Sequence, residues 1–192
     1  MGFSYLKDCY WVNISREERL FCAHLYWRIR GNVRKFIKWL NGIEPLFGKN
    51  CLNLSLDDRW EVGYEVCFYR DYLKKFNSKR SIKNTEYPPK RTFDLCLFSK
   101  NRIVIIEAKV QQGFESSQLK KFDMDKEKMK KLLKECGYAK DICIDLVGLY
   151  SSIYKPDDSV CKKFDAMFTW EMVSKLYEED DIIKKADVLY RQ

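Results

Sequence analysis

Histidine is almost absent from this sequence, and its cysteines are scattered. The chain has one histidine and eight cysteines, and no two cysteines form a C-x-x-C pair. A zinc site usually needs Cys and His ligands clustered at such short spacings, so zinc is disfavoured. Several cysteines fall inside apolar runs, namely Cys22, Cys67, Cys96 and Cys143. These positions favour reduced thiols in a packed core over a disulfide framework.

Long apolar runs are also missing. No stretch of the sequence approaches the roughly 20 apolar residues that a membrane span requires. The first residues, MGFSYLKDCYWVN, lack the basic flank and apolar stretch of a signal peptide. We therefore expect a cytoplasmic protein that does not enter a membrane.

Aromatic and basic residues, in contrast, are plentiful. Of the 192 residues, 46% are hydrophobic and 15% are aromatic, which suits a single domain with a sizeable core. The net charge is +8. A basic balance favours polyanionic partners, nucleic acid first. On its own this signal is not specific, because the lysines alternate with acids, as in DMDKEKMKK.

Apolar periodicity predicts an α/β chain. Ser15 and Glu18 form a capping box that predicts a helix starting at about residue 16, and Gly31 interrupts it. The predicted helices cover about 16–30, 33–40, 55–76, 118–136, 170–177 and 180–190, and the predicted strands 93–98, 103–110, 141–150 and 164–170. This order predicts a mixed sheet of about four strands flanked by helices. Residues 1–54 would form an N-terminal helical elaboration, 55–150 the core, and 151–192 a C-terminal strand with helices.

Charged residues interrupt the most apolar strand pair. Asp94 lies in FDLCLF, and Glu107 and Lys109 lie in IVIIEAKV, which follows after a short SKNR turn. Side chains alternate between faces along a strand, so Glu107 and Lys109 share a face, and a hairpin would bring Asp94 close to Glu107. Carboxylates at that distance repel and raise each other's pKa. A divalent cation between them removes the conflict, and hard oxygen ligands select Mg²⁺ or Mn²⁺.

This arrangement predicts a role for each residue. Asp94 and Glu107 would bind the metal, with the backbone carbonyl of Ala108 as a further ligand. Lys109 would orient or deprotonate a water, or stabilise charge on a phosphate. The simpler interpretation is that Asp94 opens a strand and that Glu107 pairs with Lys109 on an exposed edge. Against it, this is the only Glu-x-Lys in the chain, and it follows four consecutive β-branched residues, Ile103 to Ile106, as a buried strand would.

The same residues carry a family resemblance. Asp94, a gap of twelve residues and Glu107-Ala108-Lys109 resemble the signature of the PD-(D/E)XK nuclease superfamily, which has the restriction-endonuclease-like fold. The expected order of helix, strand, strand, helix and strand over residues 55–150 supports the resemblance. Phe93 replaces the proline that precedes the first acid, at a position that varies in the family. The resemblance implies that Asp94, Glu107 and Lys109 form the metal and catalytic site.

The resemblance also implies two less defined positions. A glutamate on the first core helix often completes the metal site in this family. Glu65 is the first choice, because its predicted helix directly precedes the strand of Asp94; Glu18 is the rival and Glu61 comes third. A polar residue opens the helix after the Glu-x-Lys strand, and Gln118 fits that position. Its ordinary interpretation is a first-turn residue without a special role.

The expected function is therefore hydrolysis of DNA phosphodiesters by an endonuclease with Mg²⁺ or Mn²⁺. The lysine face of helix 118–136 is either a solvated surface or a phosphate-contacting one; Lys120, Lys121 and Lys128 are the candidates for contact with nucleic acid. Cutting both strands would favour a homodimer. The alternatives are an RNA nuclease or junction resolvase, a catalytically inactive nuclease fold that binds nucleic acid or protein, and a plain α/β structural protein.

Overall fold

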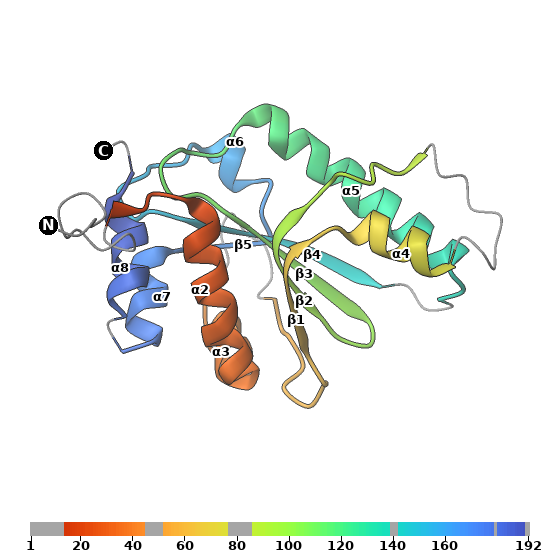
Figure 1. Cartoon of the computed structure of the whole chain (residues 1–192), viewed down its shortest axis with the longest axis horizontal. Coiled ribbons are helices and arrows are strands. Elements are labelled where there is room, and N and C mark those ends of the chain that lie inside the picture. The colour runs from red at the N-terminus through yellow and green to blue at the C-terminus, as the bar shows by residue number, and fades with distance from the viewer. Residues whose placement is uncertain (1–13, 45–51, 77–85, 139–141, 179, 191–192) are drawn as a thin grey trace, which may run out of the picture.

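The structure is a computed structural model that describes residues 14–44, 52–76, 86–138, 142–178 and 180–190. Within these residues the chain forms a five-stranded mixed sheet with helices on both faces (Figure 1). The strands are β1 (Glu61–Val66), β2 (Phe93–Phe98), β3 (Arg102–Ala108), β4 (Cys143–Tyr150) and β5 (Ala166–Thr169). They lie in the order in which they follow one another along the chain.

The sheet changes direction at β3. β1, β2 and β3 form an antiparallel meander, whereas β3, β4 and β5 run parallel. A parallel pair needs a crossover connection, and the long helix α5 (Ser116–Glu135) supplies it between β3 and β4. β3 is thus the central strand, and Ile103 to Ile106 are all buried in it. Their β-branched side chains suit a strand that is covered on both faces.

Helices cover the sheet on both sides (Figure 1). The first core joins the sheet to α2 (Glu18–Gly31), α3 (Val33–Asn41), α7 (Trp170–Leu176) and α8 (Asp181–Val188). The second core joins it to α4 (Phe68–Phe76), α5 and the short α6 (Asp158–Cys161). No helix in the described ranges is long and apolar enough to cross a membrane.

Much of the predicted layout is confirmed. The β2–β3 hairpin, the helix now labelled α5 and the strands β4 and β5 all form where the sequence places them. Gly137 ends α5 with a φ of 92°, and the N–H of Tyr138 donates to the carbonyl of Leu133, as in a glycine-terminated helix. Thr169 caps α7 by accepting a hydrogen bond from the N–H of Met172.

The helix predicted over residues 55–76 is wrong. Residues 61–66 form β1, and only 68–76 form a helix, α4. Apolar residues recur both at helical spacing and at every second position around Gly63, so the local pattern is ambiguous. Pairing with β2 decides the outcome, and a Cβ on Gly63 would lie 2.5 Å from the side chain of Val66. The sheet therefore has five strands instead of about four.

Buried thiols are confirmed in part. The six cysteines in the described residues are all free. Cys22 and Cys96 are buried, whereas Cys67 is half-buried and Cys143 is exposed at the start of β4.

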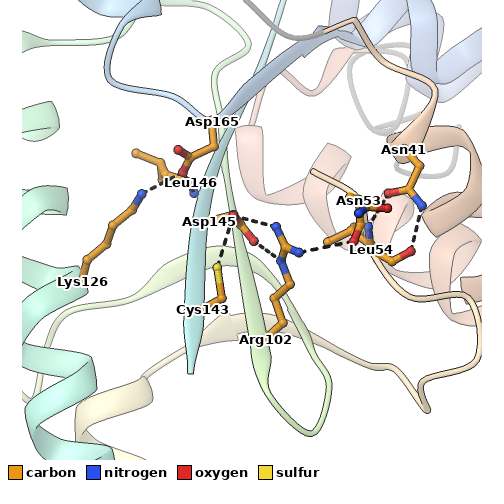
Figure 2. A network of polar contacts seen from close by, with 9 residues as sticks. All are labelled: Asn41, Asn53, Leu54, Arg102, Lys126, Cys143, Asp145, Leu146 and Asp165. Atoms are coloured by element: carbon orange, nitrogen blue, oxygen red, sulfur yellow. Dashed lines mark hydrogen bonds and ion pairs between the residues drawn. The ribbon is translucent and has the colours of Figure 1, made fainter. Parts of the chain in front are cut away.

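A polar network fastens the beginnings of β3 and β4 (Figure 2). The guanidinium of Arg102 donates to both carboxylate oxygens of Asp145, at 2.6 and 3.1 Å, and reaches the carbonyl of Asn53. The carboxylate of Asp165 accepts from the backbone N–H of Leu146 and from Lys126, both at 2.7 Å. The contacts of Arg102 lie at the start of β3, whereas the charged residues singled out by the sequence lie at its end.

Candidate active site

The β2–β3 hairpin brings the two predicted carboxylates together. Leu95 pairs with Ile106, and continuing this register places Asp94 opposite Glu107. Both residues line one cavity of about 250 Å³. One oxygen of Asp94 accepts the backbone N–H of Ala108 at 2.9 Å, which fixes the carboxylate at the end of β3.

Lys109 lies at the centre of the site. Its Nζ donates to Glu107 Oε1 at 3.1 Å and to the carbonyl of Ala108 at 2.9 Å. The backbone of Lys109 is anchored on both sides: its N–H donates to Leu149 of β4, and its carbonyl accepts from the indole of Trp170. The side chains of Glu107 and Lys109 are 3% and 14% exposed. A charge pair on an exposed edge is therefore excluded.

A third carboxylate comes from α2. Glu18 Oε1 lies 3.4 Å from Lys109 Nζ, and Glu18 Oε2 accepts the backbone N–H of Val110 at 3.2 Å. The predicted capping box is therefore wrong: α2 has Glu17 as its N-cap without a side-chain bond, and Ser15 Oγ accepts from the N–H of Glu17. Val110 is buried just past β3, and an unpaired buried N–H is costly. The hydrogen bond of Glu18 to this buried N–H therefore contributes more to stability than a capping bond at the solvated end of α2 would.

The other predicted residues lie in different places. Glu65 is on β1 instead of a helix; it lines the same cavity and pairs with Arg19 at 3.5 Å. Glu61 is exposed at the beginning of β1. Gln118 falls in the first turn of α5, but its side chain is outside those that the structure describes. Lys120 and Lys121 are exposed on α5 and Lys128 is half-buried there.

Arg91 is a site residue that sequence reasoning missed. It precedes β2, and its guanidinium lies 4.9 Å from the ring centroid of Phe93 and 4.6 Å from that of Phe122. Its Nε donates to Asp125 at 2.9 Å, and within the described part of the chain its buried Nη2 has no hydrogen-bond partner. Because Arg91 comes from an irregular polar segment, no periodicity pointed to it. Only its position three residues before Asp94 could have done so.

Two adjoining cavities make a charged groove. The smaller one holds Asp94 and Glu107, and the larger one, of about 450 Å³, extends toward Lys121 of α5. Glu18, Arg91 and Lys109 line both cavities. The groove thus combines the carboxylate cluster with cations at its wall, which is the mixture that a phosphate ester and a divalent cation need together.

Burial controls the charge states in this groove. Desolvation raises the pKa of Asp94, Glu18 and Glu107, and the neighbouring charge of Asp94 helps to raise that of Glu107 to about 7. Burial lowers the pKa of Lys109, but the carboxylates of Glu107, Glu18 and Asp94 outweigh it and raise that pKa overall. Lys109 therefore stays an ammonium at neutral pH. This favours charge stabilisation over the removal of a proton from water.

The donor set is chemically suited to a hard cation. Carboxylate and carbonyl oxygens are the ligands that Mg²⁺ and Mn²⁺ prefer. In the described residues no three His, Cys, Asp or Glu side chains already stand as a metal-ligand group. The position of Lys109 gives a physical reason, because its ammonium lies between the oxygens of Glu107, Glu18 and Ala108. The ammonium of Lys109 thus occupies the position among these oxygens that a metal ion would take.

Comparison with known proteins identifies no relative: no family model, no curated protein and no solved structure matches this chain.

Proposed function

We propose that this chain is a metal-dependent nuclease of the PD-(D/E)XK type that hydrolyses phosphodiester bonds of DNA. The observation that carries the proposal is the convergence of Glu107 and Glu18 on Lys109, in a cavity that Asp94 also lines. Asp94 and Glu107 come from the β2–β3 hairpin, whereas Glu18 comes from α2, which lies far from the hairpin in sequence. Burying several charged groups together costs free energy, and such clusters are typical of functional sites.

The arrangement of elements supports the proposal. The signature residues lie on an antiparallel hairpin that is followed by a helix and a parallel strand, as the resemblance implies. A helix with a glutamate pointing to the hairpin precedes the sheet, and that glutamate is Glu18. The net charge of +8 is consistent with a nucleic-acid substrate.

Each residue then has a distinct task. Asp94, Glu107 and the carbonyl of Ala108 would hold Mg²⁺ or Mn²⁺, with Glu18 completing the set. When bound, the cation would polarise the phosphodiester and acidify a water. Lys109, released from its carboxylate partners, would stabilise the negative charge that develops on the phosphate oxygens. Arg91 would bind a non-bridging oxygen, held in place by Asp125.

The test is nicking of supercoiled plasmid and cleavage of RNA with Mg²⁺ or Mn²⁺, combined with calorimetry of metal binding. Asp94→Asn should abolish metal-dependent cleavage and weaken metal binding at least about tenfold, since a carboxylate ligand is lost. Asp123→Asn is the matched control, because Asp123 is an exposed carboxylate that pairs with Lys163 on the surface. Equal metal affinity in the wild type and in Asp94→Asn would sink the proposal.

The outcome also separates the alternatives. Cleavage of RNA alone would identify an RNA nuclease, and cleavage of branched DNA alone a junction resolvase. A pure, folded protein that binds nucleic acid but cleaves none would be an inactive nuclease fold.

A further inference from the structure

An exposed tryptophan stands on α2, away from the core. Trp27 is 62% exposed, whereas the buried face of its helix consists of Phe21, Cys22, Leu25 and Ile29. The ring of Tyr26 lies edge-on to Trp27, with 5.1 Å between centroids. The guanidinium of Arg30 lies 5.1 Å from the Trp27 ring centroid. Trp27 is thus supported by its neighbours but contributes little to the hydrophobic core.

Contacts connect this tryptophan with the candidate active site. The ring of Tyr26 lies 6.1 Å from that of Tyr64 on β1, and the hydroxyl of Tyr64 donates to the carbonyl of Arg19 at 3.0 Å. Arg19 in turn lines the cavity that holds Asp94. Trp27 lies nine positions after Glu18, which corresponds to about 14 Å along an α-helix. A nucleic-acid strand that reaches the active site can span this distance within a few nucleotides.

The surface beside Trp27 is hollowed and basic. A groove of about 600 Å³ runs between α2 and the edge strand β1, and its lining includes Tyr26, Arg30, Arg59 and Trp60. Glu61 is the acidic residue in this lining. Arg30 and Arg59 are both exposed and outnumber it. The groove therefore complements a polyanion, in keeping with the net charge of +8.

We infer that Trp27 and Arg30 of α2, together with Arg59 just before β1, bind a single-stranded segment of the nucleic acid, with Trp27 stacking on an unpaired base. These three residues are termed here the α2 row. A base in a duplex is already stacked on its neighbours, so an exposed indole can engage it only after it leaves the stack. The arginines would contact phosphates, which carry no sequence information. The inference rests on the proposed function and narrows its substrate to nucleic acid with unpaired bases beside the cut.

Fluorescence anisotropy in EDTA tests the α2 row without cleavage. The probes are a labelled oligothymidine of about 15 nucleotides and a blunt duplex of the same length. Trp27→Ala should weaken binding of the single strand about tenfold and leave the duplex unchanged, because one base stack is lost. Trp27→Phe keeps an aromatic face and should retain most of the affinity. Arg30→Gln should weaken both probes and reduce the salt slope by about one.

Tyr138→Ala is the matched control. Tyr138 is another exposed aromatic residue, but it packs against Tyr72 and Phe76 near α4, and its removal should leave both affinities unchanged. Unchanged single-strand binding by Trp27→Ala, or equal loss on both probes, would overturn the inference. So would a change in oligomeric state of Trp27→Ala in sedimentation, which would identify a protein interface. Wild-type protein that binds the single strand but cleaves nothing with Mg²⁺ would overturn the nuclease proposal and sustain the α2 row.

Discussion

At the scale of single residues, Lys109 carries a positive charge where the proposed function requires a metal. Its ammonium offsets the buried carboxylate of Glu107 and the partly exposed one of Glu18. Breaking a buried ion pair leaves an uncompensated charge, which is more costly than the pair itself is stabilising. Lys109 thus has a structural role in the free protein in addition to the proposed catalytic one. A loss of cleavage in Lys109→Ala by itself would not separate the two roles.

A metal-rescue experiment separates them. Lys109→Met should lower the free energy of unfolding by about 3 kcal/mol in EDTA, because its carboxylate partners lose their cation. Mg²⁺ should stabilise the variant more than the wild type, since the cation no longer competes with the ammonium. Thermal denaturation with and without Mg²⁺ measures both effects, and cleavage should stay lost in the rescued variant.

The control for this experiment is Lys175→Met. Lys175 pairs with Glu171 on the exposed face of α7, so its loss should change stability by less than about 1 kcal/mol and show no response to Mg²⁺. Equal stabilisation of the wild type and of Lys109→Met by Mg²⁺ would argue that the metal ion and the Lys109 ammonium do not occupy the same position.

At the scale of elements, the glutamate closest to Lys109 comes from α2, whereas the sequence favoured one from residues 61–66. Residues 61–66 read as part of a helix carrying Glu65, but they form the edge strand of the sheet. The capping box predicted for α2 does not form, and its first-turn glutamate, Glu18, instead accepts the N–H of Val110 just past β3. The preference for Glu65 over Glu18 rested on the helical interpretation of 55–76. With that interpretation wrong, the contacts favour Glu18.

A pair of isosteric substitutions tests this exchange. Glu18→Gln should weaken Mg²⁺ or Mn²⁺ binding about tenfold, because its carboxylate already contacts the Lys109 ammonium, whose position the metal ion would take. Glu65→Gln should have a smaller effect, since Glu65 pairs with Arg19 at the cavity wall. Calorimetry of both variants gives the comparison. A larger loss of metal affinity in Glu65→Gln would favour Glu65 over Glu18 as the metal ligand, as the sequence pattern does.

At the scale of the whole molecule, the two ends of β3 have different tasks. Arg102 begins the strand and is hydrogen-bonded to Asp145 (Figure 2). Glu107 lies at the other end of the strand, and Lys109 follows directly after it. Arg102 and Lys109 are seven positions apart along an extended chain, which corresponds to about 23 Å. The ion pair of Arg102 therefore lies at the opposite end of β3 from the proposed chemistry.

Removal of the Arg102 side chain should lower stability without affecting the candidate active site at the other end of β3. Arg102→Met should lower the free energy of unfolding by about 3 kcal/mol, because Asp145 is buried and would lose its bidentate partner. Metal affinity and cleavage per folded molecule should stay within about twofold of the wild type, since distant sites act independently. Urea denaturation and calorimetry provide the two readouts.

Lys163→Met breaks an exposed ion pair with Asp123 and serves as the surface control, with an expected change below about 1 kcal/mol. A loss of metal affinity in Arg102→Met would show that the two ends of β3 are coupled.

The hairpin of Asp94, Glu107 and Lys109 followed from the sequence alone, because strand alternation, β-branched runs and a short turn are local properties. The helix α5 followed in the same way from its apolar stripe and terminal glycine. Only the tertiary structure made residues 61–66 a strand, since pairing with β2 overrides an ambiguous local pattern. It also brought Glu18 to the buried N–H of Val110, 92 positions away in sequence. No local pattern encodes such a contact, because the need to satisfy a buried donor exists only once the sheet and α2 have packed together.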